Sequence, residues 1–406
     1  MERVILHCDC NSFFASVECA YNPALKDVPV AVCGNPENRH GIILAKNEIA
    51  KKYGVNTAET IWQAKKKCPK LVLVPPHYNR YQEYSYAVNK IYEQYTDQIE
   101  PFGIDESWLD VTGSTKLFGS GEEIANKIRE QVKNELGITI SVGVSFNKIF
   151  AKLGSDYKKP DAVTVISKEN YKQIVYPLPI TDLLFVGRSC ANILNKMYIF
   201  NIGELANTNR EVLIGKLGKA GGMLYDYANG LDDSKVNSFY EKTPVKSVSK
   251  GMTFKKNLQT KSEIITGLTT LAQNVASTLR DKGIKGNCIQ VVIKDTNLKS
   301  ISRQVSLPIP TCLAKDIIDN AMNMIEKSWD LSKPIRMLSV GVSGIIDANA
   351  DELTEQYSFF CDDSNCIQTN EKQEKLESAI YNIRQKYGNS AVKPGCIINN
   401  DLGIDE

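Results

Sequence analysis

Long apolar runs are absent from this 406-residue sequence. A helix that crosses a bilayer needs roughly 20 consecutive apolar residues, and no stretch approaches that length. A secretory signal is also lacking, because residues 1–4 lead directly into a strand-like segment. We therefore expect a cytoplasmic protein that has no membrane partner.

A paired cysteine pattern is lacking as well. The 11 cysteines are odd in number and lie in apolar surroundings such as residues 6–8, which suits reduced, buried thiols better than a disulfide framework. Cys361 and Cys366 are not followed by a second Cys or His pair at zinc-finger spacing. We expect neither disulfides nor a structural zinc ion.

A large net charge is missing too, but the net value of +2 hides a division along the chain. Residues 241–346 carry 16 Lys and Arg against 8 Asp and Glu, whereas residues 347–406 carry 5 against 12. The first 240 residues are nearly balanced, with 28 against 27. A basic module favours a polyanion partner such as nucleic acid, although a solvated basic surface would have the same composition.

The length favours two to four domains. Residues 1–166 alternate short strands and helices, as in one α+β layer, and residues 15–76 form an insertion with three short strands and two basic helices. Residues 167–235 are predicted to be helical and rich in glycine turns, which either offer N–H groups to phosphates or simply end helices.

A second pattern begins beyond Pro244. The predicted order is strand 246–254, helix 261–282, strand 287–295, strand 299–307, helix 314–329 and strand 336–345. This β-α-β-β-α-β order is that of a ferredoxin-like fold. Basic residues lie on or beside these strands: Lys246, Lys250, Lys255, Lys256, Lys294, Lys299 and Arg303. One further helix is predicted over 371–387.

Two neighbouring acids interrupt the β-prone segment PFGIDESWLDVT, residues 101–112. Adjacent strand residues project to opposite faces, so Asp105 and Glu106 indicate a tight turn at a strand end, or a bound cation. Taken alone, a solvated hairpin tip explains them equally well. Asp9 also follows a buried strand, and if the two strands are neighbours the three carboxylates converge, which favours two Mg²⁺ ions and in-line displacement at phosphorus.

Three motifs together resemble those of Y-family DNA polymerases. They are DCNSFFASVE at 9–18, IDESWLD at 104–110, and SFNKIFAK at 145–152, followed by Lys159-Pro160. Within that family the chain is most similar to bacterial lesion-bypass members. The resemblance implies an α+β right-hand polymerase with a palm (1–14 and 77–166), fingers (15–76), a helical thumb (167–235), a linker (236–245), a ferredoxin-like little finger (246–346) and an acidic tail (347–406).

The resemblance also implies residue roles. Asp9 and Asp105 would bridge two Mg²⁺ ions, and Glu106 would be the catalytic carboxylate that helps ligate the ion activating the primer 3′ hydroxyl. Lys159 would reach the incoming triphosphate. Phe13 and Phe14 would line the nucleotide site, and Phe14 would be the steric gate under the sugar, although a core aromatic would look the same.

Some positions depart from the family pattern. Glu48 and Lys51 stand where many relatives carry a Tyr and an Arg that bind the triphosphate, so we expect Lys51 to contact the nucleotide and Glu48 to repel it if it points inward. Asn11 replaces an Asp and is not counted as a metal ligand. Gly103 replaces a common Ser.

The resulting hypothesis is Mg²⁺-dependent, template-directed transfer of nucleotides from dNTP to primer–template DNA, by a monomeric, low-fidelity lesion-bypass enzyme. The alternative is a catalytically silent DNA-binding or clamp-associated protein of the same fold. A nucleotidyl cyclase is a third possibility, against which the basic module speaks. In the tail, Gln356, Phe359 and Phe360 resemble a sliding-clamp-binding peptide, unless the two rings fold back onto the little finger.

Overall fold

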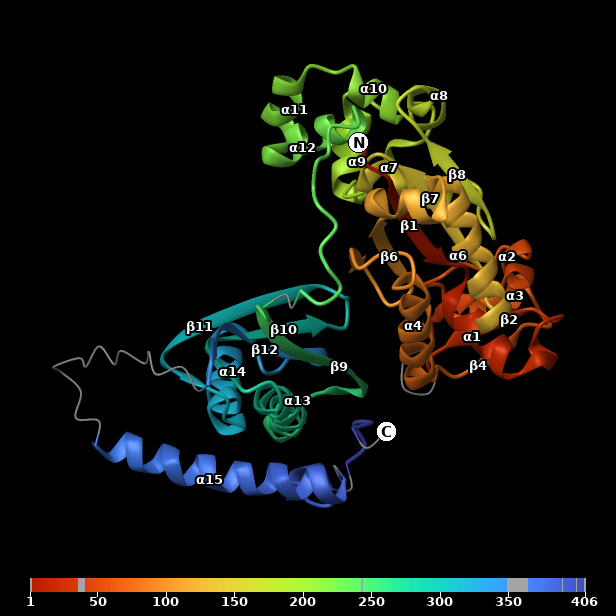
Figure 1. Cartoon of the computed structure of the whole chain (residues 1–406). Coiled ribbons are helices and arrows are strands. Elements are labelled where there is room, and N and C mark those ends of the chain that lie inside the picture. Colours follow the sequence, from red (N-terminus) through yellow and green to blue (C-terminus); the bar gives the residue numbers. More distant parts are fainter. Residues whose placement is uncertain are drawn as a thin grey trace. The chain divides into compact units, whose positions relative to one another are not determined.

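The computed structural model describes residues 2–35, 41–241, 244–348, 364–388, 390–398 and 400–404. The chain divides into two compact units (Figure 1). Unit 1 comprises residues 1–34 and 41–242, and the remainder of the chain falls in unit 2. Within the described ranges, no helix has the length and apolar character needed to span a bilayer.

Unit 1 is built on a sheet with the strand order β5-β6-β1-β7-β8. The strands are β1 (Ile5–Cys10), β5 (Ile99–Pro101), β6 (Glu106–Asp110), β7 (Ile140–Ser145) and β8 (Val163–Ile166). The central strand β1 is buried along its whole length and pairs antiparallel with both β6 and β7. The predicted strand that leads to Asp9 and the predicted turn at 101–112 are confirmed, and β5 pairs with β6 across that turn.

Helices cover both faces of this sheet because side chains alternate along β1. Leu6, Cys8 and Cys10 pack with helices α1 (Phe13–Tyr21), α4 (Tyr78–Tyr92) and α6 (Gly121–Leu136). Ile5, by contrast, packs with Trp108 and with Ala151 of helix α7 (Lys148–Tyr157).

Gly143 on β7 permits the close approach of α7. A Cβ atom at this position would lie 1.9 Å from the Ala151 carbonyl oxygen and 2.4 Å from the Ser155 nitrogen. Both atoms belong to the backbone of α7, so any larger residue would push the helix off the sheet. The absence of a side chain at Gly143 therefore brings α7 within reach of β1.

The insertion has its own small sheet, with the order β3-β2-β4. Its elements are β2 (Val30–Cys33), β3 (Ile43–Lys46), β4 (Val72–Val74), α2 (Glu48–Lys52) and α3 (Ile61–Lys67). Ala31, Ile43, Ala50 and Leu71 contribute to its core. The three predicted strands and two basic helices are confirmed.

The helical segment follows, as predicted. Its helices are α8 (Tyr171–Val175), α9 (Arg188–Lys196), α10 (Ile202–Ala206), α11 (Arg210–Leu217) and α12 (Lys219–Ala228). A short helix α5 (Thr115–Phe118) precedes α6 in unit 1.

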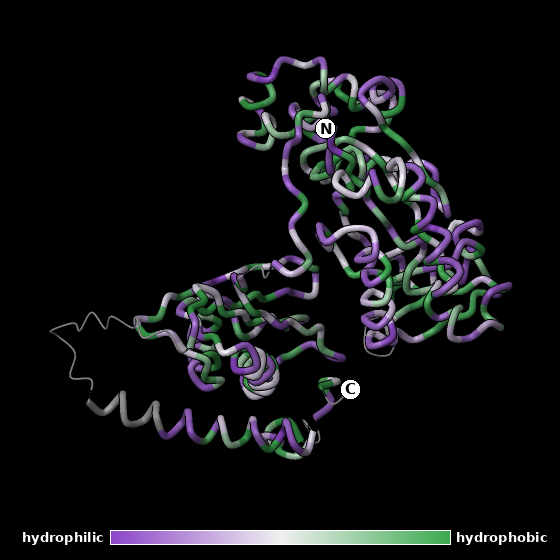
Figure 2. The backbone as a smooth tube through the Cα atoms, in the orientation of Figure 1, coloured by the Kyte–Doolittle hydropathy of each residue, from purple (hydrophilic) through white to green (hydrophobic). Residues whose placement is uncertain are grey.

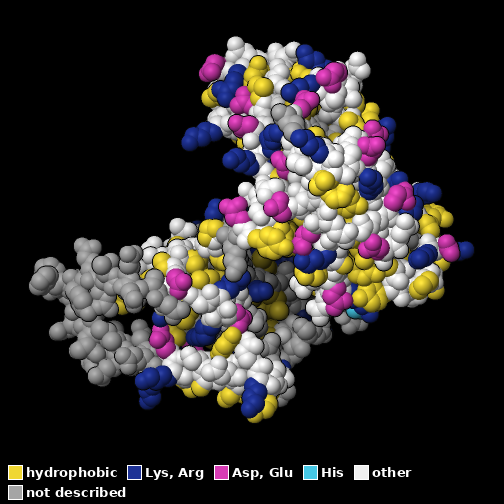
Figure 3. Space-filling view, viewed as in Figure 1, with side chains coloured by type: hydrophobic (Ala, Val, Ile, Leu, Met, Phe, Trp, Pro, Cys, Tyr) yellow, Lys and Arg dark blue, Asp and Glu magenta, His cyan; other side chains and the backbone are white. Residues whose placement is uncertain are grey.

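Basic and acidic side chains are interspersed over the face of unit 1 seen in Figure 3, in agreement with its balanced charge.

Unit 2 contains the predicted β-α-β-β-α-β order. Its elements are β9 (Ser247–Leu258), α13 (Lys261–Asp281), β10 (Ile284–Asp295), β11 (Ser300–Thr311), α14 (Ala314–Ser328) and β12 (Ile335–Asp347). The antiparallel sheet has the order β11-β10-β12-β9, so each β-α-β pair is split by a strand of the other pair. Apolar residues of the sheet, α13 and α14 form one core.

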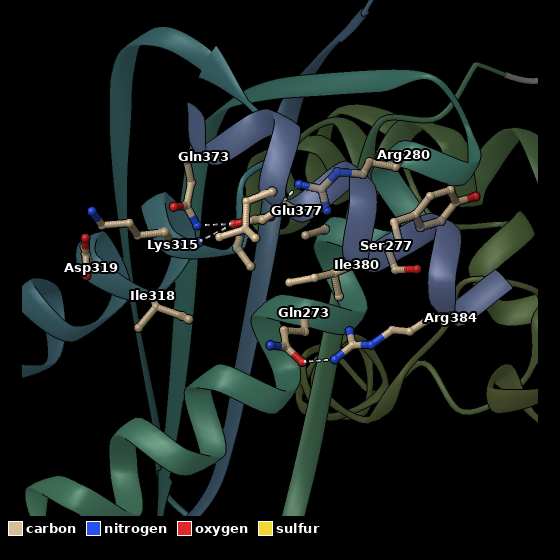
Figure 4. A pocket seen from close by; sticks show the side chains of 14 residues that line it. Gln273, Ser277, Arg280, Lys315, Ile318, Asp319, Gln373, Glu377, Ile380 and Arg384 are labelled. Carbon is tan, nitrogen blue, oxygen red and sulfur yellow. Dashed lines mark hydrogen bonds and ion pairs between the residues drawn. The ribbon is translucent and has the colours of Figure 1, made fainter. Parts of the chain in front are cut away.

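Helix α15 (Ser364–Tyr387) packs on α13 and α14 and begins seven residues before the predicted start at 371. Many of its positions are hydrophilic (Figure 2). The Glu377 carboxylate pairs with Arg280 and accepts a hydrogen bond from Ala314 N–H at 3.0 Å, at the start of α14. Arg384 donates to Gln273 at 3.1 Å. These side chains surround a cavity of about 230 Å³ between the three helices (Figure 4).

The end of the chain also joins the core of unit 2. Leu402 is 2% exposed and packs against the cluster formed by the sheet and its helices. Its carbonyl accepts a hydrogen bond from Lys255 N–H at 3.0 Å, and Asp401 lies 2.8 Å from the Lys256 ammonium. The acidic tail thus contacts the basic edge strand β9.

Candidate active site

Asp9, Asp105 and Glu106 lie where the neighbouring strands β1 and β6 of the unit 1 sheet end and begin. Asp9 of β1 lies directly opposite Glu106 of β6 in the antiparallel register, so their side chains project from the same face. Asp105 lies in the bend before β6, and its carbonyl accepts a hydrogen bond from Cys10 N–H at 2.9 Å. Residues 96 positions apart in sequence therefore meet because β1 and β6 are neighbours.

Two lysines of the SFNKIFAK segment and its continuation contact these acids. The Lys152 ammonium lies 2.6 Å from Glu106 Oε2 and 3.1 Å from Asp9 Oδ2. The Lys159 ammonium lies 2.7 Å from Asp9 Oδ2 and 2.7 Å from Asp156 Oδ1. The sequence analysis assigned a role to Lys159 but none to Lys152. Lys152 and Asp156 are four residues apart on one helix, a spacing at which opposite charges interact, and this spacing could have identified Lys152 as part of a charged cluster.

The electrostatics separate the two neighbouring acids. Burial raises the pKa of Asp105 to about 6, and the charges of Asp9 and Glu106 add to this rise. Burial opposes ionisation of Glu106 too, but contacts with His7 and Lys152 outweigh it and lower its pKa to about 2. Burial likewise works against charge on Lys152, yet the surrounding carboxylates raise its pKa.

The donor set fits a hard divalent cation. Carboxylate oxygens are the ligands that Mg²⁺ prefers, and among the described residues Lys152 and Lys159 pair with Asp9 and Glu106 but not with Asp105. Within the described part of the chain, no three Asp, Glu, His or Cys side chains are yet placed as a ready ligand cluster. The Lys152 ammonium instead supplies positive charge between Asp9 and Glu106.

The two aromatic residues after the first acid have different surroundings. Phe13 is 3% exposed and belongs to the core of the sheet. Phe14 is half-buried, and one face of its ring stacks on Tyr81 with ring centroids 4.1 Å apart and an interplanar angle of 10°. Tyr81 is held in turn by a hydrogen bond of 2.6 Å from its hydroxyl to Glu18.

The Glu48 carboxylate contacts the DCNSFFASVE motif at Ser12. Its Oε1 accepts a hydrogen bond from the Ser12 hydroxyl at 3.1 Å, and its Oε2 lies 3.6 Å from the Lys51 ammonium. The acid that departs from the family pattern is therefore partly balanced by the lysine one helical turn away.

Asn11 is engaged in structural hydrogen bonds. Its amide donates to the Ser141 hydroxyl at 2.8 Å, and its oxygen accepts from Thr139 Oγ1 at 3.0 Å and from Asp161 N–H at 2.8 Å. This network ties the end of β1 to the segments around it and accounts for an amide at this position. Gln356, Phe359 and Phe360 lie outside the described residues.

Comparisons with known proteins agree with the geometry. Residues 8–156 match the impB/mucB/samB family, and residues 245–356 match the C-terminal domain of that family. Proteins named DNA polymerase IV from Acetivibrio thermocellus and Clostridium kluyveri are similar to the chain, at 46% identity (100% of each chain) and 38% identity (98% of this chain and 99% of the relative). A solved Y-family DNA polymerase chimera is similar in fold, with a TM-score of 0.74 and 24% identity over 84% of this chain and 99% of its own.

Proposed function

The chain belongs to the Y family of DNA polymerases, and from this premise we propose that Asp9, Asp105 and Glu106 form its catalytic centre. It is a DNA-directed DNA polymerase of the lesion-bypass kind, which adds nucleotides to a primer on a DNA template. The observation that carries the proposal is the in-register placement of Asp9 opposite Glu106, with Asp105 in the adjoining bend.

Y-family polymerases use divalent metal ions, and we assign two Mg²⁺ ions to these three carboxylates. When bound, the ions lower the barrier by neutralising charge on the attacking and leaving oxygens. Asp9 and Asp105 would be the residues that hold the ions, and Glu106 would act on the primer side. Lys152 pairs with Glu106 in the metal-free site, so it would have to give up this contact for Glu106 to hold a cation.

The nucleotide is held by side chains around this centre. Lys159 is 26% exposed at its side chain and can move from Asp9 to an incoming triphosphate without leaving the site. Lys51 supports the same triphosphate from the fingers, and Phe13 lies beneath the site in the core. Phe14 excludes a 2′ hydroxyl, because its stacking on Tyr81 leaves the ring little freedom to retreat.

The proposal also assigns the domain roles that the resemblance implies. Residues 1–14 and 77–166 act as the palm, 15–76 as the fingers, 167–235 as the thumb and 246–346 as the little finger, joined by the linker at 236–245 and followed by the tail at 347–406. The excess of basic residues in 241–346 supports binding of the DNA backbone by the little finger. We further propose a cytoplasmic monomer that Gln356, Phe359 and Phe360 tether to a sliding clamp.

Primer extension tests this function directly. The wild-type protein should extend a short primer with Mg²⁺ and dNTP and should stop when EDTA is added. Asp105→Asn should reduce extension at least about a thousandfold, because a carboxylate that neutralises charge at the reacting phosphorus is lost. Binding of primer–template DNA should stay within about twofold, because most phosphate contacts lie elsewhere. Near-normal extension by Asp105→Asn would refute the assignment and favour a different centre.

A further inference from the structure

A buried histidine lies behind the carboxylates on the same face of the sheet. His7 is two residues before Asp9 on β1 and is fully buried. Its Nε2 atom lies 3.4 Å from Glu106 Oε2 and makes no hydrogen bond of good geometry with any described residue. A buried, unsatisfied ring nitrogen is costly, so its position beside a reacting carboxylate calls for an explanation.

The other ring nitrogen is firmly held. His7 Nδ1 lies 2.8 Å from the hydroxyl of Ser155, a residue of α7 that is 1% exposed. Ser155 reaches the ring because Gly143 lets α7 pack directly on the sheet. On the opposite strand, Trp108 meets the ring edge-on, with centroids 5.2 Å apart and an interplanar angle of 65°. The imidazole is therefore fixed in orientation from two sides.

The available hydrogen-bond donors and acceptors favour one arrangement of the protons on His7 and Ser155. The Ser155 oxygen lies 2.8 Å from both His7 Nδ1 and the Lys152 carbonyl, but its hydroxyl has a single proton to donate. If that proton goes to the carbonyl, a neutral His7 places an Nε2 lone pair against the Glu106 carboxylate, which is repulsive. If it goes to Nδ1, Nε2–H donates toward Glu106. Lys152 is a helical residue whose carbonyl faces its own helix ladder, so the second arrangement costs less.

We propose that His7 is a positioning residue whose Nε2–H, 3.4 Å from Glu106 Oε2 while Lys152 holds that oxygen, donates to the Glu106 carboxylate once Lys152 is displaced, and that Ser155 fixes the proton arrangement of the ring; this inference rests on the proposed function. Lys152 also contacts Glu106, but an ammonium is repelled by an incoming cation, whereas a neutral N–H donor is not. His7 therefore keeps Glu106 in place while Lys152 is displaced. Outer hydrogen-bond partners of this kind orient ligating side chains in many metal sites.

The test compares two amides at position 7 in the full-length protein. A glutamine places its N–H₂ near the Nε2 position and can still reach Glu106, whereas an asparagine reaches only the Nδ1 position near Ser155. We expect His7→Asn to weaken Mn²⁺ binding by the protein–DNA complex about tenfold, measured by electron paramagnetic resonance of free Mn²⁺, and to lower kcat by a similar factor. KM for the nucleotide should change less than about twofold, and His7→Gln should recover most of both losses.

The outcomes separate this inference from the proposed function. Equal losses in His7→Gln and His7→Asn, in step with equal losses in thermal stability, would reduce His7 to a packing partner of Trp108 and overturn the inference. Wild-type behaviour of His7→Asn would overturn it as well. Asp105→Asn is assayed alongside: if it stays active, the proposed centre fails, and if it is inactive while His7→Asn is normal, only the role of His7 fails.

Discussion

At the scale of single residues, the candidate centre combines acids that repel one another with lysines that only partly balance them. Lys152 and Lys159 contact Asp9 and Glu106, but Asp105 is left with a raised pKa of about 6. A site that must accept cations cannot satisfy its own carboxylates completely, because full internal pairing would compete with the ligand. Asp105 is therefore expected to reduce the stability of the metal-free protein.

This expectation gives a stability prediction with a defined sign. In the unfolded chain an Asp has a pKa near 3.9, so between about pH 4 and 6 the folded protein binds more protons at Asp105 than the unfolded chain does. Stability from this group is present below pH 4 and is lost as the pH rises through 6. Asp105→Asn removes the effect and should stabilise the protein in EDTA at pH 7.5 by on the order of 1–2 kcal/mol, reduced by solvent screening.

Thermal melting in EDTA over pH 4–8 measures this effect. The melting temperature of Asp105→Asn should exceed that of the wild type at pH 7.5, and the two should approach each other near pH 4. Asp97→Asn, at an exposed position of the same unit, is the matched control and should show no such trend. A constant difference at every pH would mean that Asn acts through packing rather than through charge.

A second residue-scale prediction concerns Phe14. Truncation to Ala opens the space above Tyr81 and should raise the ratio of ribonucleotide to deoxyribonucleotide incorporation at least about tenfold, which corresponds to about 1.4 kcal/mol of lost discrimination. Single-nucleotide insertion kinetics with matched rNTP and dNTP provide the ratio. Because the ratio compares two substrates on one enzyme, a general loss of activity cancels. An unchanged ratio would assign Phe14 to the core.

At the scale of elements, most strands and helices could be predicted from hydrophobic periodicity and from the order of the motifs. The strands and helices from β9 to β12 begin and end within about four residues of their predicted bounds because their apolar faces are regular. The convergence of Asp9 with Glu106 followed from assuming that their strands are neighbours. The contacts of Lys152, His7 and Ser155 could not be derived, since they depend on how closely α7 approaches the sheet, which is set by Gly143.

The docking of α15 yields an element-scale prediction. Glu377 joins Arg280 to the first turn of α14, and both charged side chains are largely buried. Glu377→Ala leaves Arg280 without its partner and should weaken the docking of α15 by about 2–3 kcal/mol. Hydrogen exchange of residues 372–387 should then accelerate by about tenfold or more.

The control for this variant is Glu374→Ala. Glu374 contacts Lys285 at 3.0 Å from the same helix, but its side chain is 45% exposed, so its removal should change exchange little. Equal acceleration in both variants would show that α15 is held by its overall charge rather than by the buried pair. No acceleration in either would assign docking to apolar contacts such as Ile380.

At the scale of the whole molecule, opposite charges are separated along the chain. The basic residues of 241–346 serve DNA binding in our proposal, whereas the acidic tail contains the proposed clamp-binding residues. A polymerase that binds DNA weakly gains from a tether, because the tether raises its effective concentration at the primer end without new catalytic contacts.

The corresponding prediction replaces Gln356, Phe359 and Phe360 together by Ala. Extension without a clamp should match the wild type, because none of these residues is assigned to the proposed catalytic centre. Stimulation by a loaded sliding clamp should disappear, since the aromatic anchors of a short docking peptide supply most of its affinity. Extension assays on a primed circle, with and without clamp and loader, measure both quantities. Equal stimulation of the variant and the wild type would place the tether elsewhere.

The central position of β1 also constrains how the protein is made. Ile5 pairs with Asp110 and with Ser145, so β1 leaves the ribosome before partners that are more than a hundred residues further along the chain. At roughly 5–20 residues per second, translation needs on the order of 5–21 s to supply β6, the earlier of the two partners. During that interval a strand that is buried at every position in the native sheet has no neighbour, so the nascent chain passes through a stage that depends on shielding from aggregation before any carboxylate centre exists.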